Sequence, residues 1–226
     1  MDYMTQSPEE IKKQRLFEAQ SYLTLLAETN SKEWTDNRIK LIEKQKEIPG
    51  WAEITEGLES YVDINYFAAI ENILQNSKML EQKGIVPDGF VQKLLNKPLP
   101  KSGETLLTGS LKNLIRNHGS DMLSETVKHI GFLIEQGVDV NAPNEKGQYP
   151  LELIFAGQKK GMKDSDFGIL KSEGHRAFFA GEPFDGYQTV EDYIISHTAE
   201  ETHAAMRNKT ATNLSVMRNM VKNWRL

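Results

Sequence analysis

The stretch GVDVNAPNEKGQYPLEL, residues 137 to 153, has two glycines ten positions apart and a proline soon after the second. A glycine directly after a helix readily takes the left-handed conformation that ends it. Proline is favoured in the first turn of a helix, where its missing N–H leaves no hydrogen bond unmade. The stretch therefore predicts that one helix ends at Gly137 and that another begins at Pro150, after an extended turn that Gly147 closes.

The residues before this turn have helical periodicity. Val127, Ile130, Leu133 and Ile134 fall on one face of a helix, and Ser124 is a candidate for its N-cap. An apolar stripe of this kind needs a neighbouring element to cover it. We therefore expect a helix-turn-helix unit that stacks on similar units.

This pattern resembles the ankyrin repeat, in which a GADVNA-type turn lies ten residues before a G-x-T-P-L-H helix start. The similarity extends over roughly residues 64 to 196, but only residues 127 to 153 match specifically. It implies an array of stacked helix pairs. The residues at matching positions are Gly137, Asp139, Val140, Asn141, Ala142, Gly147, Pro150 and Leu151.

Weaker copies flank this unit. Residues 103–108 resemble a helix start 44 residues before Gly147, and residues 186–191 resemble another one 39 residues after it. Residues 79–84 resemble the end of an earlier second helix. The spacing is irregular compared with the usual 33 residues of the family, so the resemblance implies a divergent array.

The copies also depart from the family in composition. None has a complete T-P-L-H, and Thr108 and Glu152 stand where the family has the histidine that bonds back to the turn. Ile154 and Phe155 replace small alanines that let helices approach closely. We therefore expect each unit to be weak alone and to depend on stacking and on caps.

The first hundred residues are also helical in pattern. Ser7 can cap a helix that starts at Pro8, and Glu10 can close a capping box. Expected helices cover about 8–28, 32–47, 58–80 with a break near Asp63, and 89–96. We predict an all-α fold with three parts. These are a helical N-terminal region over 1–100, with room for a degenerate first repeat, packed on a short divergent ankyrin-type helix-turn-helix array over 101–203, and a C-terminal capping helix over 204–226.

The tail from Ala204 to Leu226 has five basic residues and no acidic one, with apolar residues at helical spacing. A basic amphipathic helix can lie on a membrane surface or bind a calmodulin-like acceptor. It can also cover the apolar face of a terminal repeat while its basic side chains stay in water. We favour the capping helix, with membrane contact as the alternative.

Composition limits the function classes. A chain of 226 residues that is 38% hydrophobic can bury a core, and its formal net charge of −5 argues against a nucleic-acid partner. It contains no cysteine, so disulfides and thiolate chemistry are excluded. The N-terminal MDYMTQSPEEIKKQ lacks the apolar region of a signal peptide. We expect a cytoplasmic protein, or one translocated into a host cell without a cleaved signal peptide.

No catalytic or metal-binding motif is found. Glu200 and His203 have the E-x-x-H spacing of carboxylate-bridged metal sites, but a second such motif is missing. The sequence has no phosphate-binding glycine loop and no nucleophile elbow. We therefore predict no catalytic residue, no metal and no cofactor. The histidines outside this run are scattered: His118, His129 and His175.

Ankyrin arrays usually bind a partner protein through turn tips and first helices, so the resemblance implies a protein interaction scaffold. A divergent array behind a helical N-terminal region resembles the effectors that intracellular bacteria inject into host cells. The alternative is an enzyme or enzyme regulator whose activity lies in residues 1–100, with the repeats as a targeting module. The implied partner-binding residues are Asn141, Asn144, Glu145, Lys146, Gln148, Tyr149, Glu152 and Phe155, with Tyr187 and Glu191 in the weaker unit.

Overall fold

The computed structural model describes residues 7–27, 40, 51–63, 65–163 and 189–209. The elements in these ranges are helices, which confirms the all-α prediction for the described part of the chain. Residues 200–209 are helical as well. The helices are α1 (Pro8–Ala27), α3 (Trp51–Asp63), α4 (Phe67–Gln82), α5 (Phe90–Asn96), α6 (Leu106–Arg116), α7 (Met122–Glu135), α8 (Pro150–Lys159) and α10 (Val190–His197).

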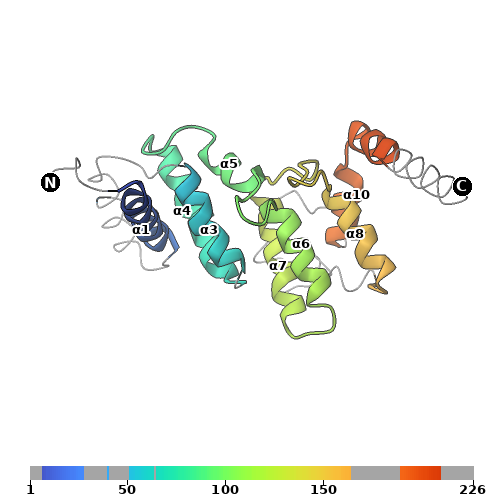
Figure 1. The fold of residues 1–226 in the computed structure, drawn as a ribbon. Helices are drawn as coiled ribbons and strands as arrows, with labels where there is room; N and C mark the ends of the chain where they lie inside the picture. The colour runs from blue at the N-terminus through green and yellow to red at the C-terminus, as the bar shows by residue number, and fades with distance from the viewer. Residues whose placement is uncertain (1–6, 28–39, 41–50, 64, 164–188, 210–226) are drawn as a thin grey trace, which may run out of the picture.

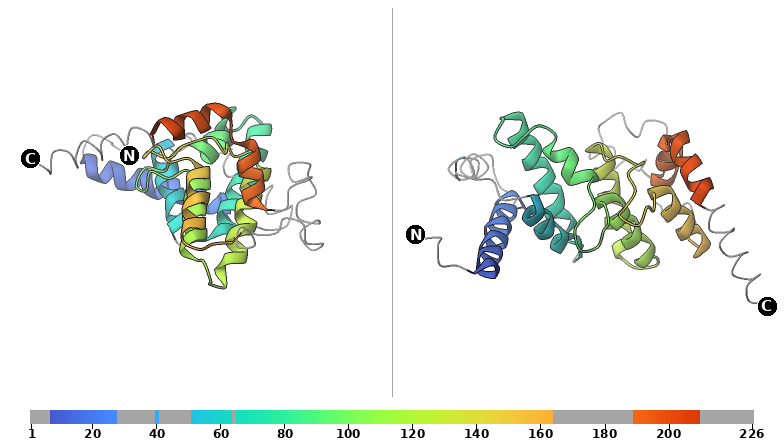
Figure 2. Two further views of the ribbon diagram at one scale, coloured as in Figure 1. Left: turned by 90° about the vertical axis from the view of Figure 1, so that its right-hand side faces the viewer. Right: turned by 45° about the horizontal axis from the view of Figure 1, so that its top comes forward.

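The helices pack in pairs that follow one another along the molecule (Figure 1). In one row, α3 contacts α6 and α6 contacts α8. Behind it, α4 contacts α7 and α7 contacts α10, while α3 pairs with α4 and α6 pairs with α7. At one end α1 packs across both α3 and α4. The result is an extended two-layer stack, seen from two further directions in Figure 2.

One continuous apolar core runs through the stack. It includes Leu23 of α1, Leu107 of α6 and Ile154 of α8, each with at most 1% of its surface exposed. Leu95 and Leu99 belong to the same core, so it passes through the region near residue 100 where the composition changes. The parts on either side of that region are therefore held together by shared burial of apolar side chains.

The central turn has the predicted local structure. Helix α7 ends at Glu135, Gly137 and Gly147 have φ angles of 84° and 67°, and α8 starts at Pro150. The predicted cap at Ser124 is wrong. Helix α7 starts at Met122, after the short turn that follows α6, so Ser124 lies inside its first turn.

The N-terminal predictions are confirmed in part. The Ser7 N–H donates to the Glu10 carboxylate at 2.8 Å, and the Glu10 N–H donates to the Ser7 hydroxyl at 3.3 Å, so the capping box forms. The break near Asp63 is confirmed, since α3 ends at this residue and α4 starts at Phe67. However, α3 begins at Trp51, seven residues before the predicted start. Apart from residue 40, the helix predicted over 32–47 lies outside the described residues.

Candidate interaction surface

The turn before α6 is held by a buried carboxylate on α3. Glu59 is 1% exposed, and its two oxygens accept the backbone N–H groups of Lys101, at 2.9 Å, and of Ser102. These donors come from residues more than forty positions later in the chain. The pairing fixes where the turn sits relative to α3, because a buried carboxylate is tolerated only when its oxygens are hydrogen-bonded.

The turn before α8 rests in the same way on the turn before α6. The Glu145 N–H donates to the Gly103 carbonyl at 2.8 Å, and the Asn144 amide donates to the Glu104 carboxylate at 2.9 Å. A Cβ on Gly103 would lie 2.9 Å from the Glu145 Cβ, and its φ of +68° also favours glycine. The backbones of the two turns therefore pack directly on each other.

Four side chains form a polar network between these turns. Asn144 is 3% exposed, and its oxygen accepts the backbone N–H groups of Lys146 and Gln148 at 3.0 and 2.9 Å. The Lys112 ammonium donates to both Glu104 and Gln148. Burial alone would raise the pKa of Glu104, but hydrogen bonds from Asn144, Lys112 and Thr108 outweigh it and lower the pKa. Glu104 therefore stays ionised inside the stack.

Thr108 and Glu152 act as helix caps. The Thr108 hydroxyl accepts the Thr105 N–H at 2.9 Å, and the Thr105 hydroxyl accepts the Thr108 N–H at 3.1 Å. The Glu152 carboxylate accepts the Tyr149 N–H at 2.8 Å. Each side chain satisfies a backbone donor that the first turn of a helix leaves free.

The Asn141 side chain, at the other end of the turn, forms hydrogen bonds with residues 197–202 of the same chain. Its oxygen accepts the Ala199 N–H at 2.8 Å and the Thr202 hydroxyl at 3.0 Å, and its amide donates to the His197 carbonyl at 3.1 Å. The residue therefore joins the end of α10 and the start of the 200–209 helix to the turn.

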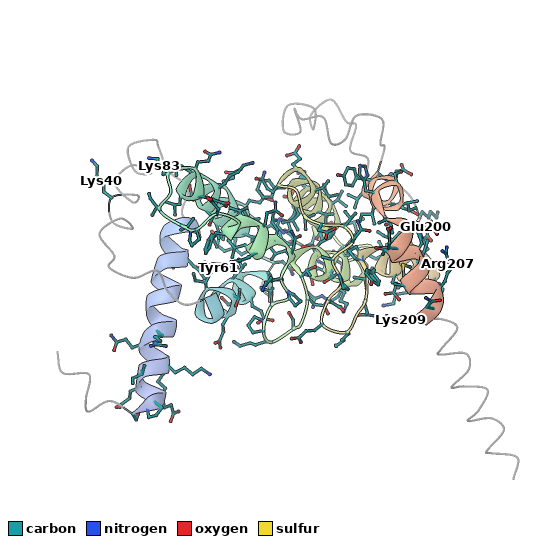
Figure 3. The ribbon with its side chains drawn as sticks, turned by 90° about the horizontal axis from the view of Figure 1, so that it is seen from above. Lys40, Tyr61, Lys83, Glu200, Arg207 and Lys209 are labelled. Atoms are coloured by element: carbon teal, nitrogen blue, oxygen red, sulfur yellow. The ribbon has the colours of Figure 1, made fainter. Side chains whose placement is uncertain are left out.

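Lys209, at the end of the described chain, reaches the start of α8. Its ammonium donates to the Gly147 carbonyl at 3.0 Å and lies 3.2 Å from the Glu152 carboxylate. The 200–209 helix thus lies beside the face that the ankyrin resemblance marks for partner contacts, with Lys209 directed inward and Arg207 outward (Figure 3).

The predicted partner-binding residues therefore separate into two groups. Glu145, Lys146 and Phe155 are exposed, Phe155 by 41%, and Tyr149 is half-buried. Asn144 is buried, and Asn141, Gln148 and Glu152 are half-buried with side chains hydrogen-bonded to other parts of the chain, as described above. Tyr187 lies outside the described residues. Glu191 is 6% exposed and accepts a hydrogen bond from Gln158, so it lies between α8 and α10.

Sequence reasoning missed three residues of this surface: Glu104, Lys112 and Lys209. Glu104 follows the glycine of a recognised helix start, which was the available signal for it. Lys112 and Lys209 were not identified because Gln148 and Glu152, which they contact, lie 36 and 57 residues away along the chain. Glu104, the other partner of Lys112, is eight residues away, which is not a helical i+3 or i+4 spacing.

Two titratable groups on α7 have shifted pKa values. His129 is 1% exposed, stacks on Phe67 at 4.4 Å and lies 3.2 Å from a Glu71 oxygen. Burial lowers its pKa, although Glu71 opposes the shift. Burial raises the pKa of Glu135 to about 7. Both shifts disfavour the charged form of the side chain.

We expect Glu135 to make stability depend on pH near neutrality. Its folded pKa of about 7 lies above the unfolded value of about 4.3. The stabilising contribution of the protonated Glu135 carboxyl to the free energy of unfolding is therefore fully present below the unfolded pKa and is lost as pH rises through 7. Urea unfolding at pH 5, 6, 7 and 8 should show wild type losing stability relative to Glu135→Gln, by on the order of 1 kcal/mol for a partly exposed group.

The difference between the two proteins isolates Glu135, because His129 is common to both. The contribution of His129 has the opposite sign, since a buried neutral imidazole is destabilising as pH falls below about 6.5. A constant difference between wild type and Glu135→Gln over this pH range would contradict the prediction.

A cleft of about 360 Å³ lies between α4, α5 and the end of α7. Its lining is mixed in polarity and in charge, since it includes Lys78, Asp88, Gln92 and Val91, and it contains no histidine. The Glu81 carboxylate at its wall accepts the Gly89 and Val91 N–H groups and so holds the start of α5.

Among the described residues, no group of three or more His, Asp or Glu side chains is arranged to hold a metal ion. Glu200 pairs with Arg207 at 2.7 Å. No helix within those ranges is long and apolar enough to cross a membrane.

No family model matches the sequence, and comparisons with curated proteins and with solved structures gave no significant match.

Proposed function

We propose that this chain is a protein interaction scaffold of the divergent ankyrin type, which binds a partner protein through its turn tips and the front of α8. The observation that carries the proposal is the stacking of successive turns on one another. Glu59 holds the turn before α6, and Glu104 and Gly103 hold the turn before α8. Turns fixed in this way present their tips as a rigid, continuous edge.

The tips and the adjoining helix face offer groups suited to protein recognition. Glu145 and Lys146 project from the rigid turn and are exposed, and Phe155 on α8 exposes 41% of its surface. Aromatic side chains contribute strongly to interfaces, and charged groups at the rim tune partner choice and association rate. We propose these three residues, with half-buried Tyr149, as the partner contacts.

The alternative is an enzyme with its site in residues 1–100. The cleft beside α4 and α5 is the candidate for such a catalytic site. However, both oxygens of its Glu81 carboxylate already accept hydrogen bonds from backbone N–H groups. A general acid or base needs a group that is available to the substrate and tuned towards working pH. The cleft therefore offers less support for catalysis than the turns offer for binding.

The test is capture of a partner from a lysate of cultured eukaryotic cells, with immobilised wild type and a Lys146→Ala/Phe155→Ala variant. Both side chains are exposed, so the variant should keep the fold, which circular dichroism checks. Binding of the captured protein, once purified, should weaken about tenfold or more in the variant, because an interface anchor is lost. Met122→Ala/Lys83→Ala is the matched control, with exposed residues away from the turns. A partner that binds wild type and both variants equally would place the contact elsewhere.

A further inference from the structure

The 200–209 helix contacts the body through one stripe of side chains. Thr202 is 7% exposed, Met206 packs against the hydrophobic core, and Lys209 reaches Gly147 and Glu152. These positions are i, i+4 and i+7, which lie on one face of a helix. Amphipathic helices that dock in a groove of another protein use this spacing for their anchors.

The opposite side of the same helix is in solvent. Glu200 and Arg207 have exposed side chains, by 78% and 65%, and pair with each other at 2.7 Å. Glu200 and Arg207 therefore lie on the side of the helix that faces away from the body (Figure 3).

The body provides a matching set of groups, which we call the helix-binding surface: Asn141, the Gly147 carbonyl and Glu152. Asn141 binds the start of the helix through the Ala199 N–H and the Thr202 hydroxyl. Two turns further on, a carbonyl and a carboxylate receive an ammonium group. The surface thus recognises a helix N-terminus, a hydroxyl and a cation at fixed spacing.

The docked helix is held by hydrogen bonds to Asn141, Gly147 and Glu152 and by Met206 against the core, and Lys209 keeps 38% of its side chain exposed. The docked state of the helix is favoured in part because the helix is tethered to the body, which gives it a high effective concentration at its binding surface. A separate helix with the same groups can compete once the tethered one is weakened.

We propose that the helix-binding surface is a recognition site for an amphipathic helix of a partner, with a hydroxyl, an apolar and a basic side chain at i, i+4 and i+7. The chain's own residues 199–209 occupy it as an intramolecular ligand until that partner replaces them. The inference rests on the proposed scaffold function and specifies the chemistry of the partner.

The test uses the full chain and a fluorescent peptide with the sequence of residues 198–209. A hydrocarbon staple replaces Glu200 and Arg207 on the solvent side, so the peptide is helical without loss of its anchors. In a Met206→Glu/Lys209→Glu variant the chain's own helix should undock, because a carboxylate replaces the ammonium beside Glu152. Fluorescence anisotropy should then show at least tenfold tighter peptide binding than to wild type.

Two controls make the result specific. Adding Glu152→Gln to the opened variant keeps an acceptor for the Tyr149 N–H but removes the charge, and it should weaken peptide binding about tenfold. Glu200→Ala/Arg207→Ala, on the outer side of the same helix, should bind the peptide as weakly as wild type does.

Hydrogen exchange of residues 199–209 shows whether the helix has undocked. An opened helix without tighter peptide binding would overturn the proposal and make the segment a plain structural cap. A 200–209 helix that stays protected in the double variant would also overturn it, because a partner helix could not then displace the docked helix from the helix-binding surface. Neither outcome depends on capture of a partner, so the scaffold proposal is tested separately.

Discussion

Asn144→Asp is expected to lower the free energy of unfolding by about 2 to 4 kcal/mol at pH 7. The substitution keeps the size of the side chain and the oxygen that accepts the Lys146 and Gln148 N–H groups. It replaces the amide donor, which lies 2.9 Å from Glu104, with a second carboxylate. Two like charges at this distance in a buried site repel strongly and lose a hydrogen bond. Urea unfolding followed by circular dichroism measures the change.

A second substitution should restore the lost stability. In Glu104→Gln/Asn144→Asp the donor and acceptor are exchanged, so the new amide at position 104 can donate to the new carboxylate at position 144. The oxygen of that amide can still accept from Lys112. The double variant should regain at least half of the loss, about 1 to 2 kcal/mol. The coupling energy should be at least this large, because Glu104→Gln alone also weakens the network. Additive effects of the two substitutions would contradict a direct contact between these side chains.

The cost of Asn144→Asp should also shrink in acid. Repulsion raises the pKa of the new carboxyl pair above its unfolded value, so the folded state gains a proton relative to the unfolded state as pH falls. A protonated carboxyl can again donate a hydrogen bond to its neighbour. The difference in the free energy of unfolding between wild type and Asn144→Asp should therefore be smaller at pH 4 than at pH 7.

Glu59→Ala should destabilise the chain by about 2 to 4 kcal/mol, a range set by leaving buried donors without a partner. The carboxylate is 1% exposed and accepts the Lys101 and Ser102 N–H groups, so its removal also opens a void between α3 and the next turn. Hydrogen exchange should show faster exchange of both amides. The stability of Glu59→Gln should lie between that of wild type and that of Glu59→Ala, because the side-chain amide of glutamine has only one acceptor oxygen.

Lys101→Ala is the matched control for Glu59. It removes a side chain from the same turn that is 64% exposed and whose ammonium lies 3.2 Å from the Glu56 carboxylate, but it leaves the Lys101 backbone N–H in place. An exposed ion pair contributes about 0 to 1 kcal/mol. Equal losses for Lys101→Ala and Glu59→Ala would show that the buried hydrogen bonds do not hold the turn.

Local structure was the most predictable part of the fold. The end of α7, the left-handed Gly137 and the start of α8 at Pro150 follow from residues within a few positions of each other. The capping box of Ser7 and Glu10 spans three residues. Interactions of this range are visible in a sequence because helix geometry sets which neighbours meet.

The role of individual polar residues in the turn was harder to predict. By its position Asn141 belongs at a turn tip, yet it joins residues 56 to 61 positions later. Glu191 was expected to face a partner, but it accepts a hydrogen bond from Gln158, 33 residues earlier, and is buried. Both residues are polar and lie next to turn glycines or helix starts, which is also the composition of an exposed surface.

The helical character of the described residues, the position of the central turn and the caps of the helices beside it follow from the amino-acid sequence. Which polar side chains remain accessible at that turn depends on how distant segments pack against it. Asn144 and Glu104 are 40 residues apart, and Lys209 and Glu152 are 57 apart. Helix and cap signals arise from hydrogen bonds between near neighbours, whereas burial of a polar group depends on which distant element packs over it.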